Sequence, residues 1–183
     1  LPPEYAISWS AGFTAAALRG LTASMDYYNI SIKDALDAPG AQNIVNRCFA
    51  GNADLCRYVF RDSAGIITSI SNTQVNLASF KTDGIDAELA YTMPVNNADN
   101  GRVNIRLIGT WVNSSIRDDG ISKIQYVGTQ GYASTEGAAR LRANASVGYA
   151  SDGFSGLVRG RFISAGYWDR TRTTLTNNRI PAY

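Results

Sequence analysis

Apolar and polar residues alternate one by one along much of this chain. In "GIDAELAY" the odd positions from Ile85 to Tyr91 are apolar, whereas Asp86 and Glu88 between them are acids. A period of two is that of a β-strand with two unlike faces. In a soluble sheet the apolar face meets a protein core, whereas in an outer-membrane barrel it meets lipid and the acids face a wet lumen. This strand alone is compatible with both.

Seven segments of the chain share the strand pattern. They are residues 7–17, 21–34, 79–93, 102–116, 135–150, 154–168 and 179–183. Most exceed the roughly five or six residues of an ordinary soluble strand. No segment has a sustained helical period, although "AQNIVNRCF" fits a short helix within a loop. No apolar run approaches the roughly 18 residues of a membrane helix. The pattern therefore predicts an all-β fold. If the chain crosses a membrane, it does so with strands.

The links between these segments alternate between short and long. "LRGL", "PVNNADNG" and "SDG" are short, whereas residues 35–78, "RDDGISKIQYVGTQGYAS" and "DRTRTTLTNN" are long. Short turns on one side and long loops on the other are typical of an antiparallel up-and-down transmembrane β-barrel. A soluble meander has no reason to keep every second link short.

Charged residues collect on one face of the predicted strands. An arginine on the lipid face costs roughly 2–4 kcal/mol at mid-depth, so five would cost roughly 10–20 kcal/mol. We therefore expect the polar face to line the lumen, where its side chains pair with one another or touch a passing ligand. Its charged residues are Asp26, Asp86, Glu88, Arg106, Arg140, Arg142, Arg159 and Arg161.

The composition excludes several other functions. The 183 residues carry 17 basic and 15 acidic side chains, a balance that does not indicate nucleic-acid binding. The sequence contains no histidine, which excludes a histidine-based catalytic or metal site in these 183 residues. Asp86 and Glu88 could in principle serve a glycosidase, but their spacing is equally that of a lumen lining. We predict no catalysis, no metal and no cofactor.

Two cysteines, Cys48 and Cys56, lie close together in the polar stretch "CFAGNADLC". They are placed to close a small disulfide loop, as is usual in an oxidising compartment. The alternative is a pair of free thiols, and two cysteines are too few for a metal site. The start "LPPEYAISWS" shows no signal-peptide pattern, so we expect an excerpt of a longer chain.

Several motifs together resemble one family. "PPEYAISWSAGF", "LTASMDYYNISIKDAL", the cysteine-bearing loop and "NLASFKTDGIDAELAY" follow one another between residues 2 and 93. In this order they resemble the C-terminal part of the barrel of TonB-dependent outer-membrane receptors. The resemblance implies a barrel of about 22 strands with a plug domain inside it. Residues 1–183 would then be a partial barrel domain, without the plug, and its two open edges would keep it from being a stable unit alone.

The resemblance also implies a function. Such receptors carry out energised uptake of a scarce, bulky nutrient, such as a siderophore or an oligosaccharide, across the outer membrane of a Gram-negative bacterium. The partners implied are the outer-membrane lipid, the receptor's own plug, the TonB energy-coupling complex and the nutrient. The luminal charges would pair with one another or hold the plug. A passive porin and a secreted β-sandwich binding module remain as alternatives.

Aromatic and arginine side chains in the long links are the candidates for nutrient binding. Aromatic faces suit sugars and aromatic chelates, and arginine suits carboxylates. The alternative is that these side chains pack the loops against one another. The candidates are Phe49, Arg57, Tyr58, Phe60, Tyr126, Tyr132, Tyr167, Trp168 and Arg170.

Overall fold

The computed structural model describes residues 2–95, 100–119, 122–131, 137–170, 172, 174 and 176–183. Its elements in chain order are β1 (Tyr5–Leu18), β2 (Leu21–Asp37), α1 (Ala41–Phe49), α2 (Ala53–Cys56), β3 (Val59–Arg61), β4 (Ile67–Ile70), β5 (Val75–Pro94), β6 (Arg102–Asp118), β7 (Lys123–Gln125), β8 (Leu141–Ala150), β9 (Ser155–Ile163), β10 (Gly166–Tyr167) and β11 (Arg179–Ile180). Among the described residues no helix is long and apolar enough to cross a membrane.

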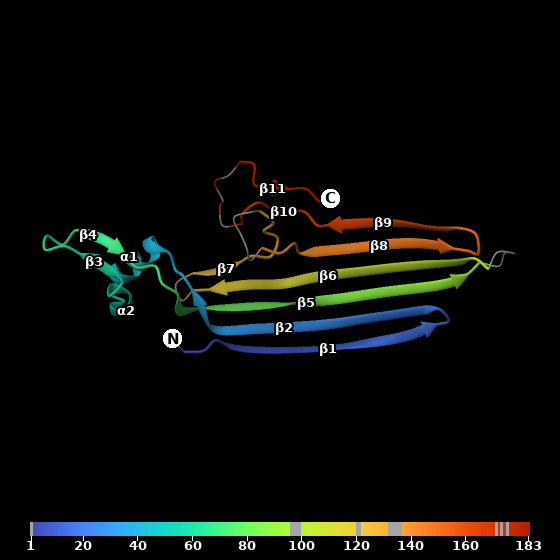
Figure 1. The fold of residues 1–183 in the computed structure, drawn as a ribbon, viewed down its shortest axis with the longest axis horizontal. Helices are drawn as coiled ribbons and strands as arrows, with labels where there is room; N and C mark the ends of the chain where they lie inside the picture. The colour runs from blue at the N-terminus through green and yellow to red at the C-terminus, as the bar shows by residue number, and fades with distance from the viewer. Residues whose placement is uncertain are drawn as a thin grey trace. The chain divides into compact units, whose positions relative to one another are not determined.

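Six long strands form one antiparallel sheet in the order β1-β2-β5-β6-β8-β9, and β7 pairs with β6 (Figure 1). Each long strand therefore lies beside the next one in the chain. The short links come after β1, β5 and β8, and the long links come after β2, β6 and β9. The sheet is open, as expected of part of a barrel, so the predicted fold class is confirmed.

The register of the strands sorts the side chains onto two faces. Ile105 of β6 lies opposite Val147 of β8, which lies opposite Val158 of β9. The next row along, one residue away on each strand, joins Arg106, Ser146 and Arg159. Because side chains on a strand alternate, the first row is on the apolar face and the second on the polar face. The arginines of β6, β8 and β9 thus share one face.

The apolar face of the sheet is bare. Val158 is 76% exposed, and Phe13, Trp9 and Ile7 of β1 are also exposed. A soluble sheet would bury such residues against a second layer, since exposed apolar patches of this extent mark interaction or membrane surfaces. The described residues provide no second layer of this kind, and the few buried apolar side chains lie elsewhere.

The chain divides into two compact units. The loop unit comprises Leu1–Ala6, Ile32–Ser79 and Asp118–Lys123, and the sheet unit comprises Ile7–Ser31, Phe80–Arg117 and Ile124–Tyr183. In the loop unit Ile44 of α1 and Leu55 of α2 are the buried apolar residues of the helices. Asn52 caps α2 by accepting a hydrogen bond from the Leu55 backbone N–H at 3.2 Å.

Several element boundaries differ from the sequence prediction. The fifth predicted strand begins at Leu141, and its expected start at residue 135 lies outside the described residues. The sixth ends at Ile163 and does not reach Trp168, because Gly166 and Tyr167 form β10 and pair with β11 instead of with β8. The predicted strand from Arg179 is short and pairs with β10. The short helix predicted for "AQNIVNRCF" is α1, whereas α2, β7 and the β3–β4 hairpin were not predicted.

Candidate functional site

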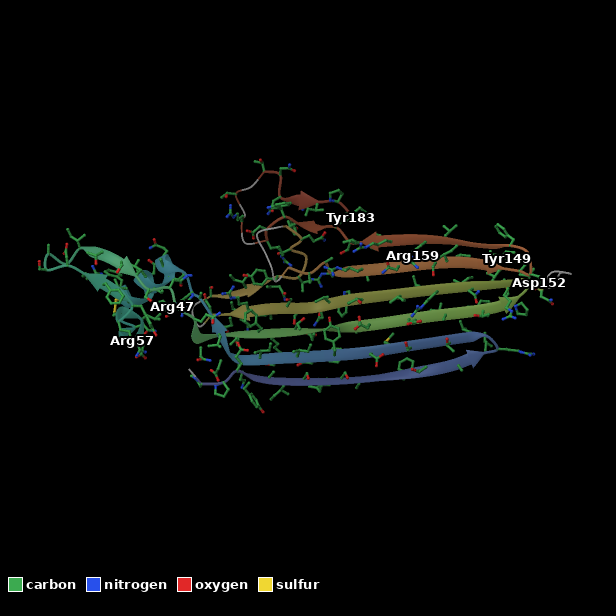
Figure 2. The ribbon with its side chains drawn as sticks, in the orientation of Figure 1. Arg47, Arg57, Tyr149, Asp152, Arg159 and Tyr183 are labelled. Atoms are coloured by element: carbon green, nitrogen blue, oxygen red, sulfur yellow. A yellow bond between two sulfur atoms is a disulfide. The ribbon has the colours of Figure 1, made fainter. Side chains whose placement is uncertain are left out.

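A row of charged side chains crosses the polar face of the sheet. Glu88 of β5 accepts two hydrogen bonds from the Arg106 guanidinium of β6, at 2.7 and 3.1 Å. Ser146 of β8 and Arg159 of β9 continue the row, and Arg159 is labelled in Figure 2. Both members of the ion pair are accessible to water, with 36% of Glu88 and 56% of Arg106 exposed. Arg106, Ser146 and Arg159 also line a hollow of about 330 Å³ on this face.

Two further rows follow on the same face. The next row joins Ile108 of β6, Asn144 of β8 and Arg161 of β9. In the row after that, Thr110 of β6 donates a hydrogen bond to Asp86 of β5 at 2.6 Å and is opposite Arg142 of β8. The two acids are thus engaged with β6, while the guanidinium groups of Arg142 and Arg161 extend the polar face beyond them. The structure therefore places a cationic surface over β8 and β9.

The two remaining predicted luminal residues are Asp26 and Arg140. Asp26 of β2 packs against Gly12 of β1, where a Cβ atom would collide with the Asp26 carboxylate. Glycine is therefore needed at position 12. Arg140 lies just before β8, is exposed, and accepts a backbone hydrogen bond from Val112 at 2.9 Å. It is not on a strand, so alternation does not fix the direction of its side chain.

Four of the predicted binding residues belong to the loop unit. Phe49 ends α1 and is 93% exposed, and Phe60 on β3 is half exposed. The Arg57 guanidinium lies 5.4 Å from the centre of the Tyr58 ring and 3.4 Å from the Asp54 carboxylate. These side chains give the unit exposed aromatic surface beside a cation.

The predicted disulfide between Cys48 and Cys56 is present and joins α1 to α2. The covalent loop that this bond closes includes Asn52, the residue that caps α2. The alternative of two free thiols is thereby excluded. The bond holds Phe49 and Arg57, which directly follow the two cysteines, in one compact segment.

Four other predicted binding residues, Tyr126, Tyr167, Trp168 and Arg170, belong to the sheet unit. Arg170 donates a hydrogen bond to the Val127 carbonyl oxygen at 2.8 Å, and its guanidinium lies 5.9 Å from the centre of the Tyr167 ring. Trp168 is half exposed. Tyr126 donates its backbone N–H to Ser115 of β6 at 2.7 Å. Arg170 is thus engaged in packing this segment. The ninth candidate, Tyr132, lies outside the described residues.

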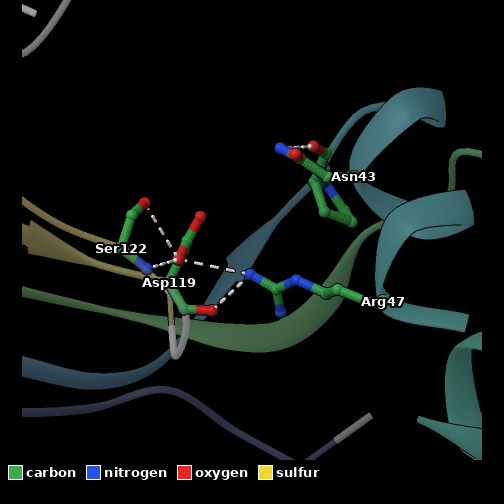
Figure 3. A network of polar contacts seen from close by, with 5 residues as sticks. Asn43, Arg47, Asp119 and Ser122 are labelled. Carbon is green, nitrogen blue, oxygen red and sulfur yellow. Dashed lines mark hydrogen bonds and ion pairs between the residues drawn. The ribbon is translucent and has the colours of Figure 1, made fainter. Parts of the chain in front are cut away.

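Sequence reasoning missed a buried arginine in the loop unit. Arg47 of α1 is 5% exposed and donates a hydrogen bond to the Asp119 carbonyl oxygen at 2.6 Å (Figure 3). The same nitrogen is 3.3 Å from an oxygen of the Asp119 carboxylate, which also accepts from the Ser122 N–H at 2.8 Å. Because Arg47 and Asp119 are 72 positions apart, no local sequence pattern predicts the contact.

It also missed a buried acid that joins three strands. Asp83 of β5 is 7% exposed and accepts hydrogen bonds from the Tyr27 hydroxyl of β2 at 3.3 Å and the Asn113 amide of β6 at 2.7 Å. The Ser114 hydroxyl donates a further one. The only sequence signal is a charge immediately before the alternating run of β5.

The described residues contain no cluster of three or more histidine, cysteine, aspartate or glutamate side chains that could hold a metal ion. The arrangement comprises one charged face, one bare apolar face and loops with exposed aromatic side chains. Such an arrangement supports binding and passage of a ligand.

Comparison with known proteins agrees with this interpretation. No curated protein matches the chain. A family model described as "TonB dependent receptor-like, beta-barrel" matches residues 1–183. Proteins of this family are transporters of the outer membrane of Gram-negative bacteria and are not enzymes, so the family also bears out the prediction that the chain is not an enzyme. The chain therefore belongs to the family of TonB-dependent receptor β-barrels.

Proposed function

We propose that this chain forms part of the barrel wall of a receptor for energised, TonB-dependent uptake of a scarce, bulky nutrient such as a siderophore or an oligosaccharide. The observation that carries the proposal is the family match over residues 1–183, in a sheet whose apolar face is bare and whose opposite face carries arginines. The bare face contacts outer-membrane lipid, and the charged face lines the lumen.

Aromatic side chains on the apolar face support this placement. The Tyr149 and Phe154 rings lie 6.2 Å apart beside the short turn after β8, and Tyr149 is labelled near this turn in Figure 2. The Trp9 and Tyr27 rings lie 5.2 Å apart between β1 and β2. Such rings are enriched at the two levels where lipid meets water. We assign these pairs to the aromatic belts of the barrel.

The luminal charges hold the plug domain in this proposal. The Glu88–Arg106 pair is open to water, and ion pairs of this kind are weak and exchange readily. Arg159 lies in the same row, beyond Ser146, and forms no ion pair within the described part of the chain, so it can engage an acidic group of the plug. Weak contacts suit a plug that the TonB energy-coupling complex must displace, whereas a buried ion pair would resist displacement.

Nutrient recognition falls to the exposed side chains of the long links. Phe49 and Phe60 offer aromatic faces to a sugar or an aromatic chelate. Arg57 donates a hydrogen bond from Nε to the Asp54 carbonyl oxygen at 2.8 Å, but 65% of its side chain is exposed, so the outer nitrogens can bind a carboxylate. Arg170 is the weakest candidate because its guanidinium is engaged with Val127 and Tyr167.

Uptake of radiolabelled ferric chelates and oligosaccharides by cells that carry the full-length receptor tests this proposal. The expected result is accumulation of one compound that stops when the energy-coupling protein is deleted or the proton gradient is collapsed. Accumulation that continues without energy would instead establish a passive porin. Recovery of the receptor in the soluble fraction would establish a secreted binding module.

A further inference from the structure

A second polar cavity lies in the sheet unit. It is at the end of the sheet where β8 begins and β9 ends, on the side of the long links. Its volume is about 260 Å³, and Thr129, Gln130, Arg142, Arg161 and Tyr183 are among the residues that line it. Tyr183 is labelled beside this end of β9 in Figure 2. Sites for drug-sized ligands occupy roughly 300–1,000 Å³. The cavity therefore suits one sugar-sized unit and not a whole bulky nutrient.

One side of the cavity is cationic. Arg142 lies opposite Ile163, and Arg161 lies opposite Asn144 two residues away, so both guanidinium groups are on the polar face of neighbouring strands. Within the described ranges neither arginine forms an ion pair with an acid. Two guanidinium groups in one cavity favour an oxygen anion, since each guanidinium can bind a carboxylate or a phosphate with two parallel hydrogen bonds.

The other side carries neutral polar groups that have no partner among the described residues. Thr129 is fully buried, and its hydroxyl forms no hydrogen bond within this part of the chain. Gln130 donates a hydrogen bond from its amide nitrogen to the Ser164 carbonyl oxygen at 2.8 Å, and its buried amide oxygen has no donor within the described ranges. Unpaired buried polar atoms are rare in folded proteins. Both atoms have almost no accessible surface, so a ligand hydroxyl would pair with them after the Thr129 and Gln130 side chains rotate into the cavity.

The backbone holds these groups in place. Gly128 accepts a hydrogen bond from the Tyr167 N–H at 2.7 Å and donates one to Ala138 at 2.7 Å. Ile163 and Tyr183 exchange two backbone hydrogen bonds, at 2.7 and 3.1 Å. The cavity is thus framed by paired backbone, and little ordering is left for a ligand to impose.

We propose that this cavity binds the carboxylate end of a polyhydroxylated acid, with Arg142 and Arg161 on the carboxylate and Thr129 and Gln130 on a neighbouring hydroxyl. The inference rests on the proposed uptake function and assigns a substrate class to it. A nutrient taken up here carries a sugar-acid or hydroxy-acid group that enters from the side of the long links.

The test uses the purified full-length receptor in detergent, with binding followed by saturation-transfer NMR and titration. Glucuronate and glucose differ in charge and share most hydroxyl groups, whereas acetate and inorganic phosphate provide the anion without the neighbouring hydroxyls. We expect glucuronate to bind at least tenfold more tightly than each of the other three. Equal binding of glucuronate and glucose, or of glucuronate and phosphate, overturns the proposal.

Single substitutions test whether glucuronate binds in this cavity. Arg142→Gln and Arg161→Gln should each weaken glucuronate binding at least tenfold, whereas Thr129→Val should reduce only the preference for glucuronate over acetate. Arg102→Gln, at the opposite end of β6, is the matched control and should stay within twofold. An equal loss in the control, or no loss in Arg161→Gln, contradicts the assignment.

Circular dichroism and heat resistance in detergent show whether each variant keeps its fold. If Arg142→Gln fails to fold, Arg161→Gln carries the test. Energised uptake of another compound by a receptor that does not bind glucuronate would refute the subsite and leave the proposed function standing. Binding of glucuronate without any energised uptake would refute the function.

Discussion

The contact between buried Arg47 and Asp119 holds helix α1 against Asp119 within the loop unit. We predict that Arg47→Ala opens this contact. Removing one partner of a buried ion pair costs about 3–5 kcal/mol. Asp119 is 23% exposed and keeps its bond from the Ser122 N–H, so part of its charge remains solvated after the substitution. The expected loss of local stability is therefore about 2–3 kcal/mol.

The loss of local stability can be measured as faster hydrogen exchange of backbone amides. Backbone amides of α1, such as the Ile44 N–H that bonds to the Gly40 carbonyl oxygen at 3.1 Å, exchange when the helix opens. A loss of about 2–3 kcal/mol raises the open population about 30- to 150-fold, and exchange rises equally when reclosing is fast. The measurement is exchange followed by mass spectrometry on the full-length receptor in detergent.

The matched control is Arg57→Ala in the same unit. Its ion pair with Asp54 is exposed on both sides, so exchange in α1 should rise no more than a few-fold. The reasoning is refuted if Arg47→Ala leaves exchange within twofold of the parent, or if Arg57→Ala has an equal effect.

Three further predictions concern the sheet and the loop unit. Val158→Arg should lower the stability of the receptor to urea in lipid vesicles by about 2–4 kcal/mol, whereas Leu157→Arg on the opposite face should have a much smaller effect. Replacing both Cys48 and Cys56 by serine should cost the loop unit about 2–3 kcal/mol, seen as faster proteolysis between α1 and β4 and reproduced by reducing the parent protein; unchanged proteolysis would contradict this. Ile44→Ala, at a side chain 1% exposed, should cost about 2–4 kcal/mol in the same assay, and a loss below 1 kcal/mol would mean that Ile44 is not part of a packed core.

The sheet could be predicted from the sequence because alternation reports the side-chain face directly. Arg106, Ser146 and Arg159 share a face in the structure, as their positions in the alternating runs require. Short links similarly make neighbouring strands antiparallel. Helix α1 was predictable for a local reason as well, since its nine residues contain no proline or glycine and end near Gly51.

Strand ends were harder because tertiary contacts set them. Alternation continues through Ala139, yet this residue is buried near Val127, and β8 begins only at Leu141. The β3–β4 hairpin did have a sequence signal. Residues 62–65 read "DSAG" between two short β-rich runs, and Asp62 accepts hydrogen bonds from the N–H groups of Ala64 and Ile66.

The candidate sites depended more on the fold. The pairing of Glu88 with Arg106 follows from neighbouring strands, so the sequence could anticipate it. The contact of Arg47 with Asp119 joins two long links, and the cavity lined by Thr129 and Arg161 joins a link to strand β9. Composition and periodicity carry no information about which distant segments meet.

The most direct test of the central claim is a spin-label scan of β9 in the full-length receptor in lipid vesicles. Because Cys48 and Cys56 are bonded to each other, a cysteine placed singly at each of residues 155–163 is the free thiol of this chain. The account predicts a period of two, with labels at 158 and 162 accessible to oxygen in the lipid and labels at 157, 159 and 161 accessible to a water-soluble nickel complex. Equal access to the nickel complex at all positions would contradict a sheet with one face in lipid.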